Sequence, residues 1–481
     1  MIPVTQDPAT ATGPAEAAQV GGSFRDPSGA CFRRGDILYR QVNACWQGHY
    51  DKLMTGGLYD ELADAGLLVA HREVQVPAAE GEAHKVIQPQ AVPFISYPYE
   101  WCFSQLKDAA LLTLDVQQRA LRRGMTLKDA SAYNVQFVGS RCVFIDTLSF
   151  ETYREGSPWL AYGQFCRHFL APLALMARRD VRLGQLLRAH IDGIPLDLAD
   201  RLLGWRGRLS PSLWMHIHLH AAAQKQYEQT PGAAAGRKVR RMALLGLIDS
   251  LATAVRRLHW RPAATPWADY YQATNYSADA LDHKARLVAA MLDRLRARTV
   301  WDLGANTGVF SRLASQRGSQ TVAMDMDPAA VEKSYLGART RGDGKLLPLL
   351  MDLANPSGEI GWANQERMSL AARGPADAAM ALALVHHLAI GNNVPLGRIA
   401  TFMASLCGSL IIEFIPKEDS QVSRMLAGCE DVFADYSQEA FERHFARHFR
   451  IEECQPVEGS RRMLYLMTAA GGAPSGNGES Q

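Results

Sequence analysis

The chain has 481 residues, of which 47% are hydrophobic and 21% are charged, values close to those of an average soluble globular protein. This composition excludes a mostly disordered, collagen-like or coiled-coil chain, and the length predicts two or three domains that can each bury a core. The 51 Lys and Arg nearly balance the 49 Asp and Glu, so net charge does not draw the chain toward nucleic acid or an anionic membrane.

Positive charge is concentrated between residues 201 and 300, which carry 16 Lys and Arg against 6 Asp and Glu. The densest run contains Arg237, Lys238, Arg240 and Arg241. Such a run is typical of a solvated helix face, and the alternative is a contact surface for a phosphate-bearing partner.

Targeting and metal signals are not found in the sequence. It contains no run of about 18 apolar residues, and its start lacks the basic and apolar segments of a signal peptide. The eight cysteines do not have the spacing of a zinc site. We therefore expect a cytoplasmic protein with no membrane span, no metal site and reduced thiols.

In chain order, the pattern divides the sequence into five parts. Residues 1–22 and 471–481 are rich in small residues and Pro, and they are predicted to be disordered tails. Residues 23–160 are predicted to form an α+β domain, with short strands that include the stretch VPFISY and a long amphipathic helix over 101–124. Residues 161–264 are mostly helical in pattern. Residues 265–470 alternate helix and apolar strand, which indicates a largely parallel α/β sheet.

The α+β part contains a spaced set of polar residues. Asp129 and Asn134 are five residues apart, and a predicted hairpin leads to Asp146, twelve residues further on. This spacing resembles the catalytic loop of protein-kinase-like and aminoglycoside-phosphotransferase-like folds. The resemblance implies that Asp129 accepts a substrate proton, while Asn134 and Asp146 hold Mg²⁺ on nucleotide phosphates.

Two parts of that machinery are missing from the pattern. No glycine-rich G-x-G-x-x-G loop is present, and Arg40 or Lys85 would have to replace the usual lysine. We therefore expect a kinase-like domain without efficient phosphotransfer. The alternatives are a working phosphotransferase, and a plain fold in which Asp129 caps a loop and Asp146 lies in a hairpin.

The helical part contains the run HIHLH, with His216, His218 and His220. On an α-helix only His216 and His220 share a face, and no acid or cysteine lies near them in sequence. The run therefore predicts a structural helix in preference to a metal site.

The most informative motif is TVWDLGANTGVFSRLAS, in which an apolar strand containing Asp302 runs into Gly304, and Gly308 precedes a helix. Two glycines four apart let the backbone approach a ligand, and the helix N-terminus offers free N–H groups. The next strand ends at Asp325, 21 residues after Gly304, where a carboxylate can hold a ribose diol. The motif is neither a G-x-G-x-x-G fingerprint nor a P-loop.

Further polar residues end the following strands. Asp352 follows one apolar strand, His386 and His387 follow the next, and Glu413 lies near the end of another. The two histidines and Glu413 are candidates for a general base or for the wall of an acceptor pocket, and packing is the alternative for the histidines.

The motifs VWDLGANTG, AMDMDPAAVEKSY, LLMDLANP and LALVHHL together resemble class I S-adenosylmethionine-dependent methyltransferases over residues 265–467. The resemblance implies a doubly wound, Rossmann-like sheet of seven strands with S-adenosylmethionine as the cofactor. A closer likeness, to bacterial nodulation-associated NoeA-like methyltransferases, is suggested by HHLAIGNNVPL and IIEFIPKEDSQV.

The resemblance also implies roles for individual residues. Gly304 and Gly308, with Asn306 between them, would border the amino-acid part of the cofactor. The acids Asp302, Asp325 and Asp352 would hold the methionine amine, the ribose and the adenine amine, respectively. Residues 267–277 would form a helix or lid.

We therefore expect a methyltransferase whose N-terminal half recognises an unidentified acceptor or regulates access to it. The alternatives are a bifunctional or phosphotransfer enzyme and a non-catalytic binding module.

Overall fold

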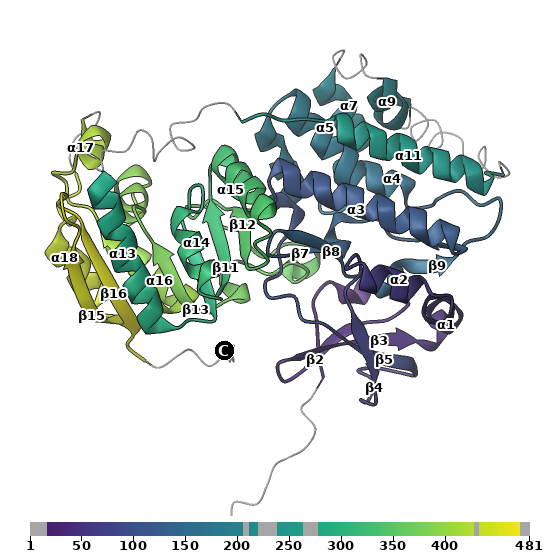
Figure 1. Cartoon of the computed structure of the whole chain (residues 1–481), viewed down its shortest axis with the longest axis horizontal. Coiled ribbons are helices and arrows are strands. Elements are labelled where there is room, and N and C mark those ends of the chain that lie inside the picture. Colours follow the sequence, from purple (N-terminus) through teal and green to yellow (C-terminus); the bar gives the residue numbers. More distant parts are fainter. Residues whose placement is uncertain (1–16, 205–210, 220–237, 263–277, 428–431, 472–481) are drawn as a thin grey trace, which may run out of the picture.

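The computed structural model describes residues 17–204, 211–219, 238–262, 278–427 and 432–471. Figure 1 shows two bodies side by side, an N-terminal half coloured purple to teal and a C-terminal half coloured green to yellow. The predicted domain boundary near residue 265 and the predicted lid over 267–277 lie outside the described residues.

The C-terminal half is built on a seven-stranded sheet. Its strands are β10 (Thr299–Leu303), β11 (Gln320–Asp325), β12 (Leu346–Leu350), β13 (Ala376–Ala381), β14 (Cys407–Phe414), β15 (Phe449–Pro456) and β16 (Met463–Ala469). They lie in the order β12-β11-β10-β13-β14-β16-β15, and β16 runs opposite to the other six. The predicted seven-stranded, doubly wound sheet is therefore confirmed.

Helices cover both faces of this sheet, which is why its inner strands are mostly apolar, whereas the edge strand β15 has the polar sequence FRIEECQP. The helices are α13 (Ala278–Leu295), α14 (Val309–Gln316), α15 (Pro328–Arg341), α16 (Leu396–Leu406), α17 (Ser420–Leu426) and α18 (Gln438–Phe445). Alternate strand residues face opposite sides: Val300 and Met380 pack with α13 and α14, whereas Trp301 and Ala379 share a core with α16 and α18.

The N-terminal half opens with a five-stranded antiparallel sheet. Its strands are β1 (Ala18–Gln19), β2 (Cys31–Arg34), β3 (Ile37–Asn43), β4 (His71–Val74) and β5 (Ala83–Pro89), in the order β1-β2-β3-β5-β4. Two helices follow β3, α1 (Gln47–Thr55) and α2 (Leu58–Asp64), and Gly57 between them has a φ of 72°.

The prediction that residues 1–22 form a disordered tail is wrong for the last residues of this range. Ala18 and Gln19 pair with β2, and the amide of Val20 donates to the carbonyl of Cys31. Gly21 and Gly22 also lie against the backbone of residues 365–366 of the C-terminal half. Small side chains bury little apolar surface, which is why the composition predicts disorder, but here the order comes from hydrogen bonds of the backbone.

A long helix, α3 (Phe103–Arg122), organises the rest of the N-terminal half. Two small antiparallel pairs follow it, β6 (Met125–Leu127) with β9 (Phe150–Thr152) and β7 (Val135–Val138) with β8 (Arg141–Phe144). The next helices include α4 (Tyr162–Phe165), α5 (Ala171–Arg178), α6 (Leu186–Ala189), α7 (Leu196–Leu203), α9 (Pro211–Leu213) and α11 (Arg241–Arg257). Because α5 and α11 pack on α3, the predicted helical segment shares a core with the α+β part.

A buried ion pair joins the two halves. The guanidinium of Arg373 donates to both carboxylate oxygens of Glu100, at 2.8 and 2.6 Å, and the two side chains are 2% and 0% exposed. The hydroxyl of Ser357 also donates to Glu100, at 2.6 Å. One apolar core runs through both halves around this pair.

Within the parts of the chain that the structure describes, no helix is both long and apolar enough to cross a membrane.

Candidate functional site

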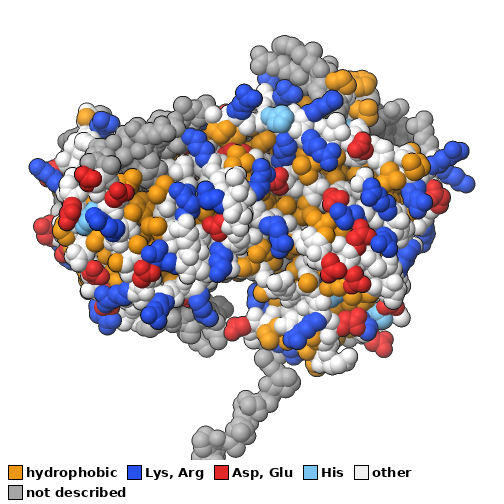
Figure 2. All heavy atoms as spheres, in the orientation of Figure 1, with side chains coloured by type: hydrophobic (Ala, Val, Ile, Leu, Met, Phe, Trp, Pro, Cys, Tyr) orange, Lys and Arg blue, Asp and Glu red, His pale blue; other side chains and the backbone are white. Residues whose placement is uncertain are grey.

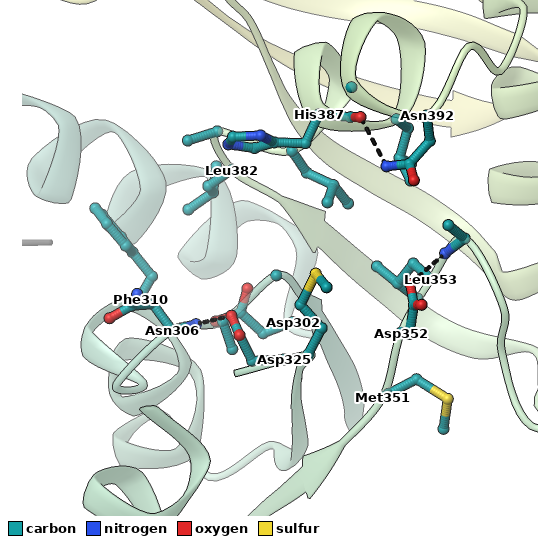
Figure 3. A pocket seen from close by; sticks show the side chains of 18 of the residues that line it. Asp302, Asn306, Phe310, Asp325, Met351, Asp352, Leu353, Leu382, His387 and Asn392 are labelled. Carbon is teal, nitrogen blue, oxygen red and sulfur yellow. Dashed lines mark hydrogen bonds between the residues drawn. The ribbon is translucent and has the colours of Figure 1, made fainter. Parts of the chain in front are cut away.

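A cavity of about 200 Å³ opens at the carboxyl ends of β10, β11, β12 and β13 (Figure 3). The order of the sheet reverses between β10 and β13, and the crevice at such a switch point is where open α/β sheets bind ligands. Each of the four strands contributes to the wall. The lining includes Asp302, Gly304, Asn306, Asp325, Met351, Asp352, Leu382, Ala383, Leu384 and His387.

Asp302, on β10, is the most deeply buried of the three acids. Its side chain accepts a hydrogen bond of 2.5 Å from the hydroxyl of Ser311 on α14. Burial raises the pKa of Asp302 to about 7, and the nearby negative charge of Asp325 acts in the same direction. An unligated cavity therefore holds Asp302 only partly ionised near neutral pH.

The glycine turn follows Asp302. Gly304 has a φ of 79° and lines the cavity, and a Cβ built there would lie 3.3 Å from Leu384. Asn306 also lines the cavity, with a φ of 51°. At these two positions the backbone can therefore come close to a ligand in the cavity, as the sequence predicts.

Gly308 does not border the cavity, in contrast to the prediction. It begins α14 with a φ of 75°, and a Cβ there would lie 2.7 Å from the hydroxyl oxygen of Ser334 on α15. This glycine is required by backbone conformation and by close packing of two helices.

Asp325 ends β11 and accepts backbone hydrogen bonds from Asn306, at 2.7 Å, and from Asp327, at 2.8 Å. These bonds tie the tip of β11 to the glycine turn. Burial raises the pKa of Asp325 to about 6. Asp352 lies after β12, where it accepts from the amide of Ala354 at 2.9 Å (Figure 3).

Only one of the two predicted histidines reaches the cavity. His387 lines its wall opposite Asp302 and Asp325 (Figure 3), and burial lowers its pKa. His386 is 2% exposed and lies outside the lining, and its Nδ1 atom has no hydrogen-bond partner among the described residues. The two rings lie against each other, with their centres 4.0 Å apart, at the start of the π-helix His387–Gly391.

Glu413 is not part of the wall either. It is fully buried, and its Oε2 atom accepts from the amide of Ala383 at 2.7 Å and from the ammonium of Lys284 at 2.6 Å. A carboxylate held by two donors is poorly placed to accept a substrate proton.

Sequence reasoning missed Lys284, which lines the cavity with a side chain that is 3% exposed. A signal was present. In α13, Lys284 lies four residues before Val288 and seven before Met291, so it shares the apolar face that these buried residues mark.

The structure also brings together the polar set of the N-terminal half. Asn134 donates to the hydroxyl of Ser149 at 3.2 Å, and that hydroxyl donates to Asp146 at 2.6 Å. Asp129 lies close to both residues. Burial and the negative charge of Asp146 raise the pKa of Asp129, and a hydrogen bond from Asn134 lowers it.

Arg40 on β3, one of the two predicted substitutes for lysine, lies beside the cluster of Asp129, Asn134 and Asp146. Its guanidinium lies 2.6 Å from Asp146. Lys85 instead pairs with Glu73, 2.6 Å away on the neighbouring strand. Asp146, the expected metal ligand, is therefore paired with a cation of the chain itself.

The turn after β1 also covers this region. Lys128 donates to Asp26 at 2.9 Å and to the hydroxyl of Ser28 at 2.6 Å. A Cβ on Gly29 would lie 2.7 Å from Leu148. The turn thus packs against the short 3-10 helix that begins after Asp146.

No family model matches the sequence. A curated relative, the nodulation protein NoeA of Rhizobium meliloti (strain 1021), is 36% identical over 456 residues, which cover 93% of this chain and 95% of NoeA. The chain belongs to the NoeA family. The likeness indicated by HHLAIGNNVPL and IIEFIPKEDSQV is confirmed.

Solved structures resemble parts of this NoeA-family chain. Magnesium protoporphyrin IX methyltransferase (ChlM) from Synechocystis PCC 6803 with bound SAH is 17% identical, covers 45% of this chain and 92% of its own, and has a TM-score of 0.30. The bifunctional kinase-methyltransferase WbdD is 16% identical, covers 43% of this chain and 42% of its own, and has a TM-score of 0.29. Each match spans less than half of the chain, so the fold assignment rests on the strand order above.

The histidine run of this NoeA-family protein lies in a π-helix (Trp214–Leu219) and not in the predicted α-helix. His216 bonds to the hydroxyls of Tyr162 and Ser250 at 2.8 and 3.0 Å, and His218 bonds to Asp200. His220 lies outside the described residues. Among the described residues, no group of three His, Cys, Asp or Glu is placed to hold a metal ion.

The basic run is exposed where the structure describes it, at Lys238, Arg240 and Arg241, while Arg237 lies outside the described residues. Figure 2 shows positive and negative side chains interspersed over the visible face of the molecule. A phosphate-bearing partner for this segment of the NoeA-family chain stays a prediction.

Proposed function

We propose that this chain is a methyltransferase that uses S-adenosylmethionine. The observation that carries the proposal is the cavity at the switch point, where the ends of three neighbouring parallel strands present Asp302, Asp325 and Asp352. Three acids on neighbouring strand ends suit a long cofactor that has an ammonium group, a ribose diol and an adenine amine.

The lining fits that cofactor chemically. Gly304 leaves backbone at the wall where a side chain would enter it, and the walls between the acids are largely apolar, with Phe310, Leu382 and Met351. A sulfonium compound needs such a dry, shaped pocket because methyl transfer depends mainly on in-line alignment.

The residues would divide the cofactor among them. Asp302 would hold the methionine amine, Asp325 the ribose hydroxyls and Asp352 the adenine amine. The bound cofactor supplies an activated methyl group. The chain aligns it, excludes water and, at His387, offers an imidazole on the cavity wall that can accept a proton from the acceptor.

Calorimetric titration with S-adenosylmethionine tests this proposal. We expect binding by the unaltered protein, and Asp325→Ala should weaken it by about 1.5–3 kcal/mol through loss of hydrogen bonds to a charged group. Asp36→Ala, at an exposed turn far from the cavity lining, serves as the control and should bind normally. Unchanged affinity in Asp325→Ala would contradict the ribose assignment, and binding without transfer to any acceptor would favour a binding module.

We further propose that the N-terminal half has a kinase-like fold that recognises the acceptor and does not transfer phosphate. The clustering of Asp129, Asn134 and Asp146 supports the fold. The pairing of Arg40 with Asp146 supports the absence of phosphotransfer, because that reaction needs Asp146 free for Mg²⁺. Thermal-shift titration with ATP and Mg²⁺ should leave the melting temperature unchanged. ATP turnover that is lost in Asp146→Ala but kept in Asp325→Ala would show a working phosphotransferase instead.

A further inference from the structure

Lys284 is the only Lys or Arg among the described residues that line the cavity. It rises from α13, and its Nζ atom lies 5.0 Å from the centre of the Phe310 ring. Removing an ammonium group from water costs several kcal/mol unless partners compensate for it. A cation kept in this wall therefore needs negatively charged partners.

Glu413 supplies part of that compensation. It is fixed by the amide of Ala383, itself a residue of the cavity wall, and it holds Lys284 at 2.6 Å. Arg462 lies behind it, 4.0 Å from the other carboxylate oxygen, and pairs mainly with Asp419. This arrangement fixes the ammonium at the edge of the cavity.

The position of Lys284 relative to Asp302 points to the ligand group. Both residues line the cavity, and beyond the larger effect of burial, Asp302 raises the pKa of Lys284 and Lys284 lowers the pKa of Asp302. An amino-acid ligand carries an ammonium and a carboxylate on one carbon, and it therefore needs an acid and a cation close together. Asp302 and Lys284 form such a couple beside the glycine turn.

We propose that Lys284 binds the carboxylate of the methionine part of the cofactor, and that Glu413 is a positioning residue that holds Lys284. This inference rests on the proposed function. It replaces the expectation that Glu413 acts as a base, and it adds a residue from α13, the helix that precedes the glycine motif.

The test uses two ligands that differ only in the carboxylate, S-adenosylmethionine and decarboxylated S-adenosylmethionine. Calorimetry on the unaltered protein should show a preference of about tenfold to hundredfold for the carboxylated ligand, as expected for a charge-assisted hydrogen bond. Lys284→Met should lose this preference by weakening only the carboxylated ligand. Lys284→Arg, which keeps the charge, should retain most of it.

Lys284→Met leaves Glu413 buried without its cation, so this variant alone does not separate lost binding from lost folding. The double variant Lys284→Met/Glu413→Gln removes both charges and should stay folded, since neutral replacement of a buried pair is commonly tolerated. It should show the same loss of preference.

Two results would overturn the inference alone. One is a preference that persists in the folded double variant, and the other is an equal loss of affinity for both ligands, which would indicate a purely structural lysine. Absence of binding of either ligand by the unaltered protein would overturn the proposed function as well, so the two failures are distinguishable.

Discussion

At the scale of single residues, burial sets the chemistry of the cavity. Asp302 is surrounded by protein, and the hydroxyl of Ser311 donates a hydrogen bond to its carboxylate. Its pKa of about 7 lies above that of an unfolded Asp, so the folded state binds the proton more tightly. The contribution of Asp302 to stability is therefore greatest below the unfolded pKa near 4 and is lost as the pH rises through about 7.

Asp302→Asn should remove this pH dependence, because the amide keeps the shape without a charge. We expect the unligated variant to gain on the order of 2 kcal/mol over the unaltered protein at pH 8 and little at pH 4. Thermal unfolding at the two pH values measures the difference. An equal effect at both would show that Asp302 does not carry the charge.

The affinity of the unaltered protein should also depend on pH. S-adenosylmethionine is cationic, and its ammonium group needs an ionised Asp302. With the pKa values of Asp302 and Asp325 raised to about 7 and 6, affinity should increase from pH 5.5 to pH 8. Calorimetry across this range would contradict the assignment if affinity were flat or fell.

At the scale of elements, the local sequence pattern predicted a strand wrongly at a place where side-chain hydrogen bonds replace those of a β-sheet. The stretch VPFISY has strand-like composition, but residues 92–97 form no strand. Its polar backbone is satisfied by side chains: Gln136 accepts from the amide of Ser96, and Arg373 donates to the carbonyl of Ile95. The segment therefore lies in the contact between the halves.

The start of α14 gives a prediction at this scale. Gly308→Ala should cost about 1–2 kcal/mol of stability, because a side chain disfavours the left-handed backbone there, and it would also crowd Ser334. Affinity for S-adenosylmethionine should stay within a few-fold, since Gly308 does not line the cavity.

Gly246→Ala is the matched control for Gly308→Ala. Gly246 lies inside α11, where an added Cβ would have nothing within 4 Å, and the substitution should stabilise the protein by about 0.5–1 kcal/mol. Denaturant unfolding compares the two variants. Lost binding in a folded Gly308→Ala would restore the expectation that Gly308 borders the cofactor.

At the scale of the whole molecule, the two bodies of Figure 1 share one apolar core and a buried ion pair. The guanidinium of Arg373 also lies 4.8 Å from the ring of Phe94 and 5.0 Å from that of Tyr97. The halves are therefore expected to unfold together in one transition.

Glu100→Ala should destabilise the protein by about 3–5 kcal/mol, because it leaves the cation of Arg373 buried without its partner. Asp197→Ala breaks an exposed pair whose side chains are 73% and 64% exposed, and it should change stability by less than about 0.5 kcal/mol. Scanning calorimetry compares them. Equal effects would show that the contact between the halves does not depend on this pair.

The sequence by itself determined the features that neighbouring residues decide. The strand, glycine turn and helix from Thr299 to Gln316, and the acids at Asp325 and Asp352, follow from periodicity and from backbone freedom at Gly304. Parallel strands then bring these ends to one edge of the sheet.

Only the tertiary structure decided which side chains meet across long separations. Lys284 and Glu413 are 129 residues apart, and Arg40 on β3 meets Asp146, which follows β8 and begins a short 3-10 helix. Their pairing depends on how helices and sheets pack, because a buried charge is tolerated only where packing supplies its partner. The local sequence pattern could not distinguish His387, on the cavity wall, from its buried neighbour His386, because packing decides which of the two side chains faces the cavity.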